Sequence, residues 1–355
     1  MALISASKKF SIGILKGKVN FPVSLAPMVG LSHVALRLAI REYLPENAVT
    51  IWPTEMLNSR KIPIENLQTT PECMRSSNEA ELVPQILGNE EKPIRESIVK
   101  LKEWGAEGID INMGCPVQKA LKHNYGVALM GDPNYAKEVV QFAKSSSDLP
   151  VSVKLRAGSQ NDFEFLKKFV FGLQDAGADW LTLHPRTAEQ KRRGRADWIQ
   201  IKELKKLLSI PLIGNGDIQA SQDVHRMLSE TNCDMVMAGR ALAAKPWMLW
   251  QLGEDWGFDL PQAKTGKAPR GSYEEGKEYG KFLLRLLDLM KIYFNEDLTQ
   301  RKFRFYVKTT SVWLPFGHSL YALMTKAKTT VEMKEYIEEF FSQDIEMSDY
   351  TELRQ

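Results

Sequence analysis

The chain has 355 residues with 43% hydrophobic and 26% charged residues, which is typical of a globular protein with one large domain or two smaller ones. The 47 basic and 44 acidic residues give a net charge of +3, which excludes a protein that coats nucleic acid through overall charge but not a local basic surface. No stretch approaches the ~20 apolar residues of a membrane span, and the segment MALISASKKFSIGILKGKVN lacks the apolar run of a secretory signal, so we expect no membrane partner.

Short apolar segments alternate with helical patterns along most of the chain. Residues 93–106 place Ile94, Ile98 and Leu101 at helix spacing, and residues 161–178 begin with capping residues and end at a glycine. The expected strands are 21–28, 48–56, 82–88, 108–114, 150–158, 179–187, 210–218 and 234–242. This α/β pattern predicts a (β/α)8 TIM barrel. The alternative, a doubly wound open sheet, is disfavoured because the APMVGLS that ends the first strand is not a G-x-G-x-x-G turn.

The pattern changes after the eighth strand. Residues 253–272 are rich in Gly, Pro and Lys and predict a linker. The remainder, 273–355, is helical throughout, net basic up to Lys308 and net acidic from Glu332. We therefore expect a barrel domain at 1–252 followed by a small C-terminal all-helical domain.

Function in a barrel lies at the carboxyl ends of the strands, and here those ends are strongly polar. The residues there are Pro27, Met28, Glu55, Gln85, Asn112, Cys115, Lys154, Arg156, His184, Arg186, Asn215, Gly216, Asp217, Gly239 and Arg240. The glycine turns 214–217 and 238–241 follow the seventh and eighth strands, where barrels bind phosphate. Tight turns without a ligand are the alternative for either glycine segment.

Two side chains at strand ends are of a type that can bind a negatively charged ring. Lys154 and His184 are placed to stabilise negative charge on a reduced flavin. A lysine that extends to the rim and a hydrogen-bonded core histidine explain the same pattern equally well.

Cys115 lies in a Gly-Cys-Pro turn just after a predicted strand. None of the histidines stands at metal-ligand spacing with a cysteine or another histidine, so we expect no metal site. A thiol with a pKa of ~8.5 is mostly protonated near neutrality and is therefore a competent proton donor, whereas a lone cysteine is most often simply buried. We interpret Cys73 and Cys233 as structural, and three widely spaced cysteines indicate a reducing, cytoplasmic compartment.

A set of motifs in fixed order resembles the tRNA-dihydrouridine synthases, of the bacterial, FMN-dependent type. The motifs are LAPMVGLS, TEM, GIDINMGCPVQK, VKLRAG, LHPRT, RADW, IGNGDI and MAGRAL, dense over residues ~20–252. The resemblance implies reduction of uridine to 5,6-dihydrouridine in tRNA, with FMN as cofactor and NADPH as reductant. It also implies hydride transfer from flavin N5 to uracil C6 and a proton from Cys115 to C5.

The resemblance assigns roles to individual residues. Pro27 and Met28 would lie along the flavin ring, Gln85, Lys154 and His184 would contact it, and Cys115 would be the proton donor. The phosphate would be held by Asn215, Gly216, Asp217, Gly239 and Arg240, and the uridine would be contacted or ordered by Asn112, Lys119, Arg156 and Arg186.

The basic loop 191–195 and the basic half of the helical domain are the expected tRNA contacts, and we expect a monomer. One departure from the family pattern is His33, which replaces the usual Asp or Asn.

Two other functions fit parts of the pattern. An FMN barrel of the dihydroorotate or dihydropyrimidine dehydrogenase type would act on a free pyrimidine and would need no basic helical domain. A barrel that binds RNA without catalysis would carry no flavin.

Overall fold

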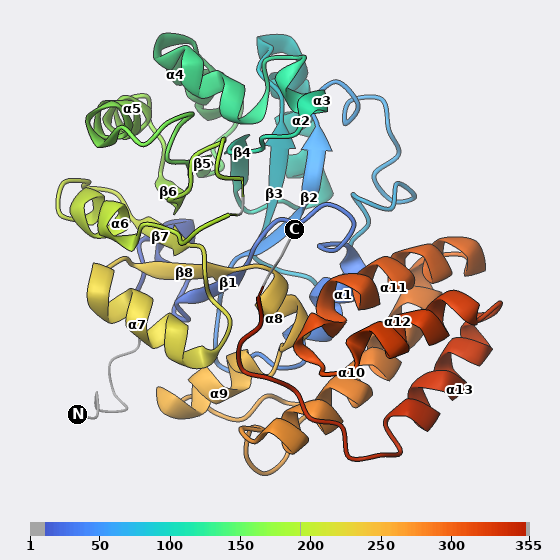
Figure 1. Ribbon diagram of the computed structural model, residues 1–355. Helices are drawn as coiled ribbons and strands as arrows, with labels where there is room; N and C mark the ends of the chain where they lie inside the picture. Colours follow the sequence, from blue (N-terminus) through green and yellow to red (C-terminus); the bar gives the residue numbers. More distant parts are fainter. Residues whose placement is uncertain (1–10, 192, 353–355) are drawn as a thin grey trace.

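Parallel strands form a nearly closed barrel. In the computed structural model, which describes residues 11–191 and 193–352, the eight-stranded sheet has the order β1-β8-β7-β6-β5-β4-β3-β2 (Figure 1). The strands are β1 (Val23–Leu25), β2 (Trp52–Asn58), β3 (Leu82–Leu87), β4 (Ile109–Met113), β5 (Val151–Arg156), β6 (Trp180–His184), β7 (Leu212–Asn215) and β8 (Met235–Ala238). The Phe21 N–H donates to the Val49 carbonyl (3.0 Å), and the Thr50 hydroxyl donates to the Val23 carbonyl (2.5 Å). These two hydrogen bonds connect the segment around β1 to the residues just before β2. The expected (β/α)8 barrel is confirmed.

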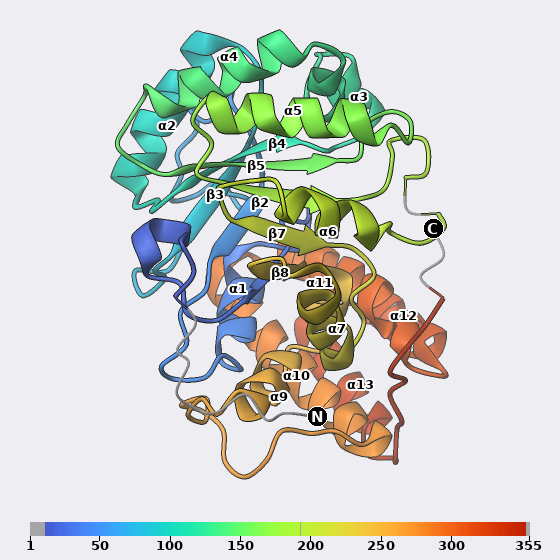
Figure 2. The ribbon, with the colours of Figure 1, turned by 90° about the vertical axis from the view of Figure 1, so that its left-hand side faces the viewer.

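Helices cover the outside of the barrel (Figure 2). They are α1 (Val34–Arg41), α2 (Glu91–Trp104), α3 (Gln118–Leu121), α4 (Pro133–Lys144), α5 (Phe163–Asp175), α6 (Trp198–Lys205), α7 (Ser221–Thr231), α8 (Arg240–Ala244) and α9 (Met248–Asp255). Short 3-10 helices span Ile14–Gly17, Gly126–Gly131 and Ser311–Trp313. Strands β4, β7 and β8 are buried at every position, as expected for a parallel sheet covered on both faces.

Local signals that we interpreted as helical hold in the structure. Ile94, Ile98 and Leu101 form the buried face of α2. Asp162 caps α5 by accepting a hydrogen bond from the Phe165 N–H (2.9 Å). His33 caps α1 in the same way, since its Nδ1 accepts from the Leu36 N–H (3.3 Å). The histidine therefore does the capping work for which Asp and Asn are usually preferred.

The amino end of the barrel is filled by apolar side chains. Ile12, Ile14 and Leu15 pack in one buried cluster with Trp180 and Met235. This packing leaves the carboxyl ends of the strands as the polar, accessible end.

The C-terminal helices are α10 (Ser272–Tyr293), α11 (Glu296–Thr310), α12 (Gly317–Lys326) and α13 (Thr330–Phe340), in orange and red in Figure 1. The Tyr43 hydroxyl donates to Glu278 of α10 (2.8 Å), and the Tyr306 hydroxyl of α11 donates to the Ala243 carbonyl of α8 (2.7 Å). One apolar core continues from the barrel helices into α10–α13. Helix α9 also runs to Asp255, so the division at 253–272 stays a prediction.

The chain after α13 returns to the barrel, which the sequence did not suggest. The Lys245 ammonium donates to the carbonyls of Ser348 (2.8 Å) and Asp349 (2.9 Å). Gln219, after β7, exchanges hydrogen bonds with the backbone of Thr351 (3.0 and 3.2 Å). This tail thereby comes to lie beside the carboxyl end of β7. No helix in the described part of the chain has the length and apolar character needed to cross a bilayer.

Candidate active site

The carboxyl ends of β1, β5, β6, β7 and β8 surround a cavity of about 230 Å³. Its lining residues are Ala26, Pro27, Met28, Lys154, Arg156, His184, Arg186, Asn215, Gly216, Asp217, Ile218, Met237, Ala238, Gly239, Arg240 and Ala241. The structure therefore brings together every predicted cofactor residue except Gln85. Arg156 and Arg186, predicted for the substrate, lie in the same wall.

Burial sets the charges of the cavity. The Lys154 ammonium donates to Asn215 Oδ1 (3.1 Å), and burial, followed by repulsion from Arg156, lowers the pKa of Lys154 to about 8. Burial also lowers the pKa of His184, with smaller effects from Lys154 and the neighbouring arginines. His184 Nε2 lies 3.1 Å from Arg186 Nη1, and because arginine can only donate, the ring nitrogen accepts. His184 is therefore a neutral imidazole with its proton on Nδ1.

Arg186 is fixed at the edge of the cavity. Its Nη2 donates to Asp217 Oδ1 (2.5 Å) and to the Gly194 carbonyl (2.6 Å). Its Nε is buried and has no hydrogen-bond partner among the described residues. A buried donor without a hydrogen-bond partner lowers the stability of the folded state.

Gly216 makes the close turn after β7. It has φ +118°, and a Cβ there would lie 2.9 Å from the Ala196 Cβ and 3.0 Å from His184 Cδ2. The Trp198 indole N–H donates to the Gly216 carbonyl (3.1 Å). Only glycine fits this position, as both the predicted anion-binding turn and a tight turn without a ligand require, so the anion-binding role stays a prediction.

A polar layer lies below the cavity, inside the barrel. Gln85 Nε2 donates to Asp110 Oδ2 (2.6 Å), and Asp110 Oδ1 accepts from the Ser152 hydroxyl (2.6 Å). Burial raises the pKa of Asp110 against these two hydrogen bonds. Asn112 Nδ2 donates to Gln85 Oε1 (2.7 Å). Gln85 thus orients Asn112, a link that sequence spacing could not reveal because the residues lie on different strands.

Asn112 holds the turn that carries Cys115. Its Oδ1 accepts hydrogen bonds from the Gly114 N–H (3.1 Å) and the Cys115 N–H (2.9 Å). From behind, the Val127 N–H donates to the Cys115 carbonyl (3.1 Å). The backbone of the cysteine is therefore fixed by hydrogen bonds from two sides.

The environment of Cys115 keeps it a thiol. The residue is 9% exposed and packs with Ala120, Tyr125, Met56 and Leu87. Burial raises its pKa, whereas a hydrogen bond with the Val117 backbone and then the cations Arg156 and Lys154 lower it by less. A raised pKa disfavours the thiolate that a nucleophile or metal ligand requires and favours a proton donor.

Arg156 connects the Cys115 turn to the opposite loop. Its Nε donates to the Gly114 carbonyl (2.9 Å), and its Nη1 donates to the carbonyls of Lys191 (2.6 Å) and Thr187 (3.2 Å). Lys119, also predicted for the substrate, lies in α3, and its side chain is outside the described part of the structure.

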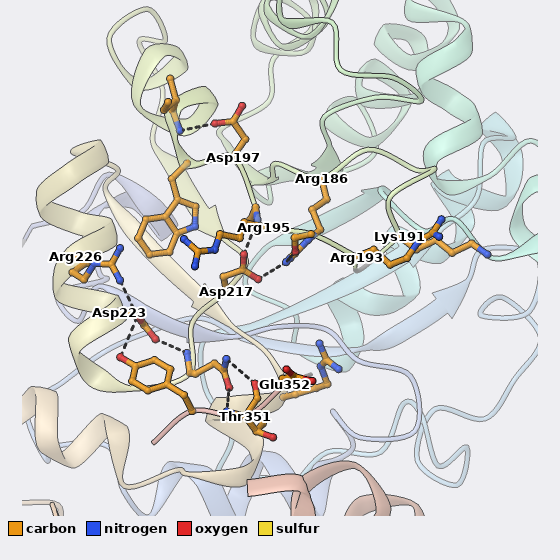
Figure 3. A pocket seen from close by; sticks show the side chains of 17 residues that line it. Arg186, Lys191, Arg193, Arg195, Asp197, Asp217, Asp223, Arg226, Thr351 and Glu352 are labelled. Carbon is orange, nitrogen blue, oxygen red and sulfur yellow. Dashed lines mark hydrogen bonds and ion pairs between the residues drawn. The ribbon is translucent and has the colours of Figure 1, made fainter. Parts of the chain in front are cut away.

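A second and larger hollow, which we call the basic basin, adjoins the cavity and has a volume of about 1640 Å³ (Figure 3). It shares Arg186, Asp217 and Arg240 with the cavity. Its full lining is Arg186, Lys191, Arg193, Gly194, Arg195, Ala196, Asp197, Trp198, Ile199, Asp217, Gln219, Asp223, Arg226, Arg240, Tyr350, Thr351 and Glu352. Cations outnumber carboxylates in this lining.

The basin lies between the basic loop 191–195, which the sequence predicted, and the returning tail, which it did not. Lys191, Arg193 and Arg195 belong to the basic loop predicted to contact RNA, whereas Arg192 lies outside the described residues. Arg193 and Arg195 are exposed, and neither pairs with a carboxylate of the described chain. The opposite wall is the returning tail, Tyr350–Glu352, which no local sequence pattern predicted.

Within the described residues, no group of three or more His, Cys, Asp or Glu side chains is arranged to hold a metal ion.

Comparison with known proteins agrees with this geometry. Residues 24–346 match the family described as Dihydrouridine synthase (Dus). The chain is 34% identical over 247 residues to "Probable tRNA-dihydrouridine synthase 1" of Synechocystis sp., an alignment that covers 69% of this chain and 68% of the relative. It is 31% identical to the "Probable tRNA-dihydrouridine synthase" of Aquifex aeolicus, over 89% of this chain and 95% of that protein.

A solved structure shares the fold at low sequence identity. The histamine dehydrogenase from Rhizobium sp. 4-9 superimposes with a TM-score of 0.54 at 13% identity, over 80% of this chain and 51% of that chain. The family match covers most of the chain, and the motifs that carry it converge at one end of the barrel. The chain belongs to the dihydrouridine synthase family.

Proposed function

We propose that this protein reduces uridine to 5,6-dihydrouridine in tRNA, using FMN held in the cavity at the barrel mouth. The observation that carries the proposal is Cys115, a thiol that burial keeps protonated, on a turn fixed by Asn112. Arg156, a cavity residue, ties that turn to the cavity through Gly114. The relatives named tRNA-dihydrouridine synthase support the same activity.

The residues of the cavity fit FMN. The Gly216 turn, which has no room for a Cβ, and the first N–H groups of α8 after Gly239 suit a phosphate, with Asn215, Asp217 and Arg240 beside them. Lys154 and neutral His184 offer donors toward a ring. Pro27 and Met28 supply the wall along it. When bound, the flavin supplies the hydride for uracil C6.

The contact of Gln85 with the ring stays a prediction. In the structure its amide nitrogen is engaged by Asp110 and its oxygen by Asn112. Its clearest role is to orient Asn112.

Cys115 provides the proton. Reduction at C6 places negative charge on C5 and the O4 carbonyl, and the Sγ–H of Cys115 delivers its proton to C5. The sulfur is left as a thiolate, which Arg156 and Lys154 stabilise, in line with the direction of their effect on its pKa. Protonation from solvent then restores the thiol. Asn112 acts by holding the cysteine, and we propose Arg156, Arg186 and Lys119 as groups that order the uracil.

The basic basin suits the RNA that surrounds the target uridine. The uridine must leave its stack to reach the cavity, which costs a few kcal/mol and needs contacts elsewhere. Lys191, Arg193 and Arg195 are exposed beside the cavity and can neutralise phosphates. We propose NADPH as the reductant and the cytoplasm as the compartment, and we expect the protein to act as a monomer.

Purified protein reconstituted with FMN tests the proposal directly. With NADPH and unmodified tRNA, we expect dihydrouridine in the RNA, detected by mass spectrometry of its nucleosides. Mapping dihydrouridine in tRNA from cells with and without this protein would identify the positions. A flavin-loaded protein that leaves tRNA unchanged but oxidises dihydroorotate or dihydrouracil would refute the proposal and favour the free-pyrimidine alternative. Protein that takes up no flavin and binds RNA would favour the non-catalytic alternative.

A further inference from the structure

A bulge in β2 turns Glu55 out of the regular strand pattern. The pairing of β2 with β3 shifts register between Pro53 and Met56. The Thr54 hydroxyl fills the gap, accepting from the Gln85 N–H (3.2 Å) and donating to the Glu55 carbonyl (2.7 Å). Bulges of this kind re-aim a side chain, often beside an active site. Met56 packs with the Cys115 cluster, whereas Glu55 reaches the loop after β1.

Both carboxylate oxygens of Glu55 are engaged, and one of the partners comes from the C-terminal helices. Oε2 accepts a hydrogen bond from the Gly30 N–H (2.5 Å). Oε1 accepts from the ammonium of Lys302 in α11 (3.1 Å). The two side chains are 2% and 10% exposed, so the ion pair is buried. A residue nearly 250 positions away thus completes a contact at the barrel mouth.

The same helix covers Gly30 from the other side. Gly30 has φ +80°, and a Cβ on it would lie 2.8 Å from the ring of Phe305. Phe305 follows Lys302 by about one turn of α11. Gly30 is therefore held between the Glu55 carboxylate and an aromatic ring, both of which depend on α11.

The loop that contains Gly30 forms part of the cavity wall. Ala26 and Met28 line the cavity. The Ser32 hydroxyl links the two ends of this loop, since it accepts a hydrogen bond from the Met28 N–H (2.8 Å) and donates one to the Ala26 carbonyl (3.0 Å). A displacement of Gly30 therefore moves the backbone that lines the cavity.

A buried ion pair is a weak source of stability because desolvation offsets its attraction, yet its geometry is specific. We propose that Lys302 is a positioning residue for the active site: through Glu55 it fixes the Gly30 loop, so that the C-terminal helices form part of the catalytic wall. The kinetic consequence rests on the proposed function, whereas the structural consequence does not.

Hydrogen exchange of the flavin-loaded protein tests the structural consequence. In Lys302→Met, the amide of Gly30, followed in a peptide spanning 27–36, should exchange ~10-fold faster, because its acceptor loses the partner that holds it. Lys302→Arg should restore protection. Lys308→Met removes the same charge from an exposed position of α11 and should leave the peptide unchanged. Unchanged protection in folded Lys302→Met would overturn the proposal.

Steady-state kinetics test the functional consequence. Lys302→Met should lower kcat about 10-fold and leave the Kd for tRNA within about twofold, because misplacement affects the reaction more than docking. Lys334→Met, on the exposed face of α13, is the matched control with unchanged kcat. A loss of tRNA affinity with normal kcat would make Lys302 a binding residue and overturn the positioning role.

Two further results complete the test. If Lys302→Met does not fold, Glu55→Gln keeps the size and an acceptor for Gly30, removes the ion pair, and should show both effects more weakly. If wild-type protein forms no dihydrouridine, the proposed function fails, and the exchange experiment still decides the structural link.

Discussion

The cavity at the barrel mouth and the basic basin adjoin each other, yet they are built differently. The cavity, about 230 Å³, has side chains positioned by buried hydrogen bonds, such as Lys154 to Asn215, and burial sets their protonation. The basin, about 1640 Å³, is lined by exposed cations such as Arg193 and Arg195, for which no carboxylate partner exists in the described chain. Under the proposed function, the cavity would carry the chemistry, which requires fixed atoms, and the basin would dock RNA, which tolerates mobile charges.

The largest expected effect on the reaction rate is that of replacing Cys115. Cys115→Ala should lower the rate of dihydrouridine formation by roughly 10²- to 10⁴-fold, because it removes the proton donor. Flavin absorbance and the Kd for tRNA should stay unchanged, since the cysteine holds neither. Cys115→Ser, with a much weaker acid, should also be slow. Near-normal turnover in Cys115→Ala would show that another group protonates C5.

Gly216→Ala tests whether the cavity depends on a backbone that only glycine can adopt. A methyl group there meets the Ala196 Cβ at 2.9 Å and would be held at φ +118°. The strain of about 1–3 kcal/mol should displace the turn and weaken FMN binding ~10- to 100-fold, measured by flavin fluorescence titration. Gly131→Ala, where an added Cβ meets nothing within 4 Å, is the control and should bind FMN normally. Equal affinity in both variants would place the phosphate elsewhere.

The pH dependence of the reaction should report the buried charge of Lys154. Its pKa is lowered to about 8, so kcat should fall about tenfold per pH unit above that value if the cation is required. Lys154→Met should have a low kcat, and this kcat should not show the fall above a pH of about 8.

Titration of Lys154 cannot lower kcat above a pH of about 8 by unfolding the protein. Between pH about 8 and 10.5 the unfolded lysine binds more protons than the folded one, so this group adds stability as pH rises. Thermal melts at each pH distinguish a loss of stability from a loss of kcat. If kcat of Lys154→Met still falls above a pH of about 8, another group causes the fall.

Single substitutions of basin residues should have the smallest effects. Arg195→Ala should weaken tRNA binding only a few-fold and reduce the salt slope by about 0.7 to 0.9, the value for one phosphate contact, with kcat unchanged. Lys92→Ala, which removes an 85% exposed lysine outside the basin, should change neither quantity. A loss in kcat as large as that of Cys115→Ala would erase the distinction between the two regions.

Much of the fold and of the cavity was predictable from the sequence because those features are local. Apolar strands buried on both faces and capped helices such as α5 predict the barrel from periodicity. The barrel rule then places strand-end residues together, and the structure puts Met28, Lys154 and Asn215 in one cavity. Gln85 was placed at the right end of the barrel, but its bonds to Asp110 and Asn112 depend on register between strands.

The sequence by itself determined the alternation of strands and helices, the polar residues at the strand ends and the resemblance to the family, because these follow from spacing along one chain. Only the tertiary structure decided how distant segments complete the site. The tail at Tyr350–Glu352 closes the basin, and Lys302 reaches Glu55 from α11. Contacts across so many residues leave no local pattern, since each partner alone resembles an ordinary surface charge or turn. The protonation of Cys115 was also decided there, because burial beside Met56 of β2 and Leu87 of β3, together with Ala120 and Tyr125, raises its pKa.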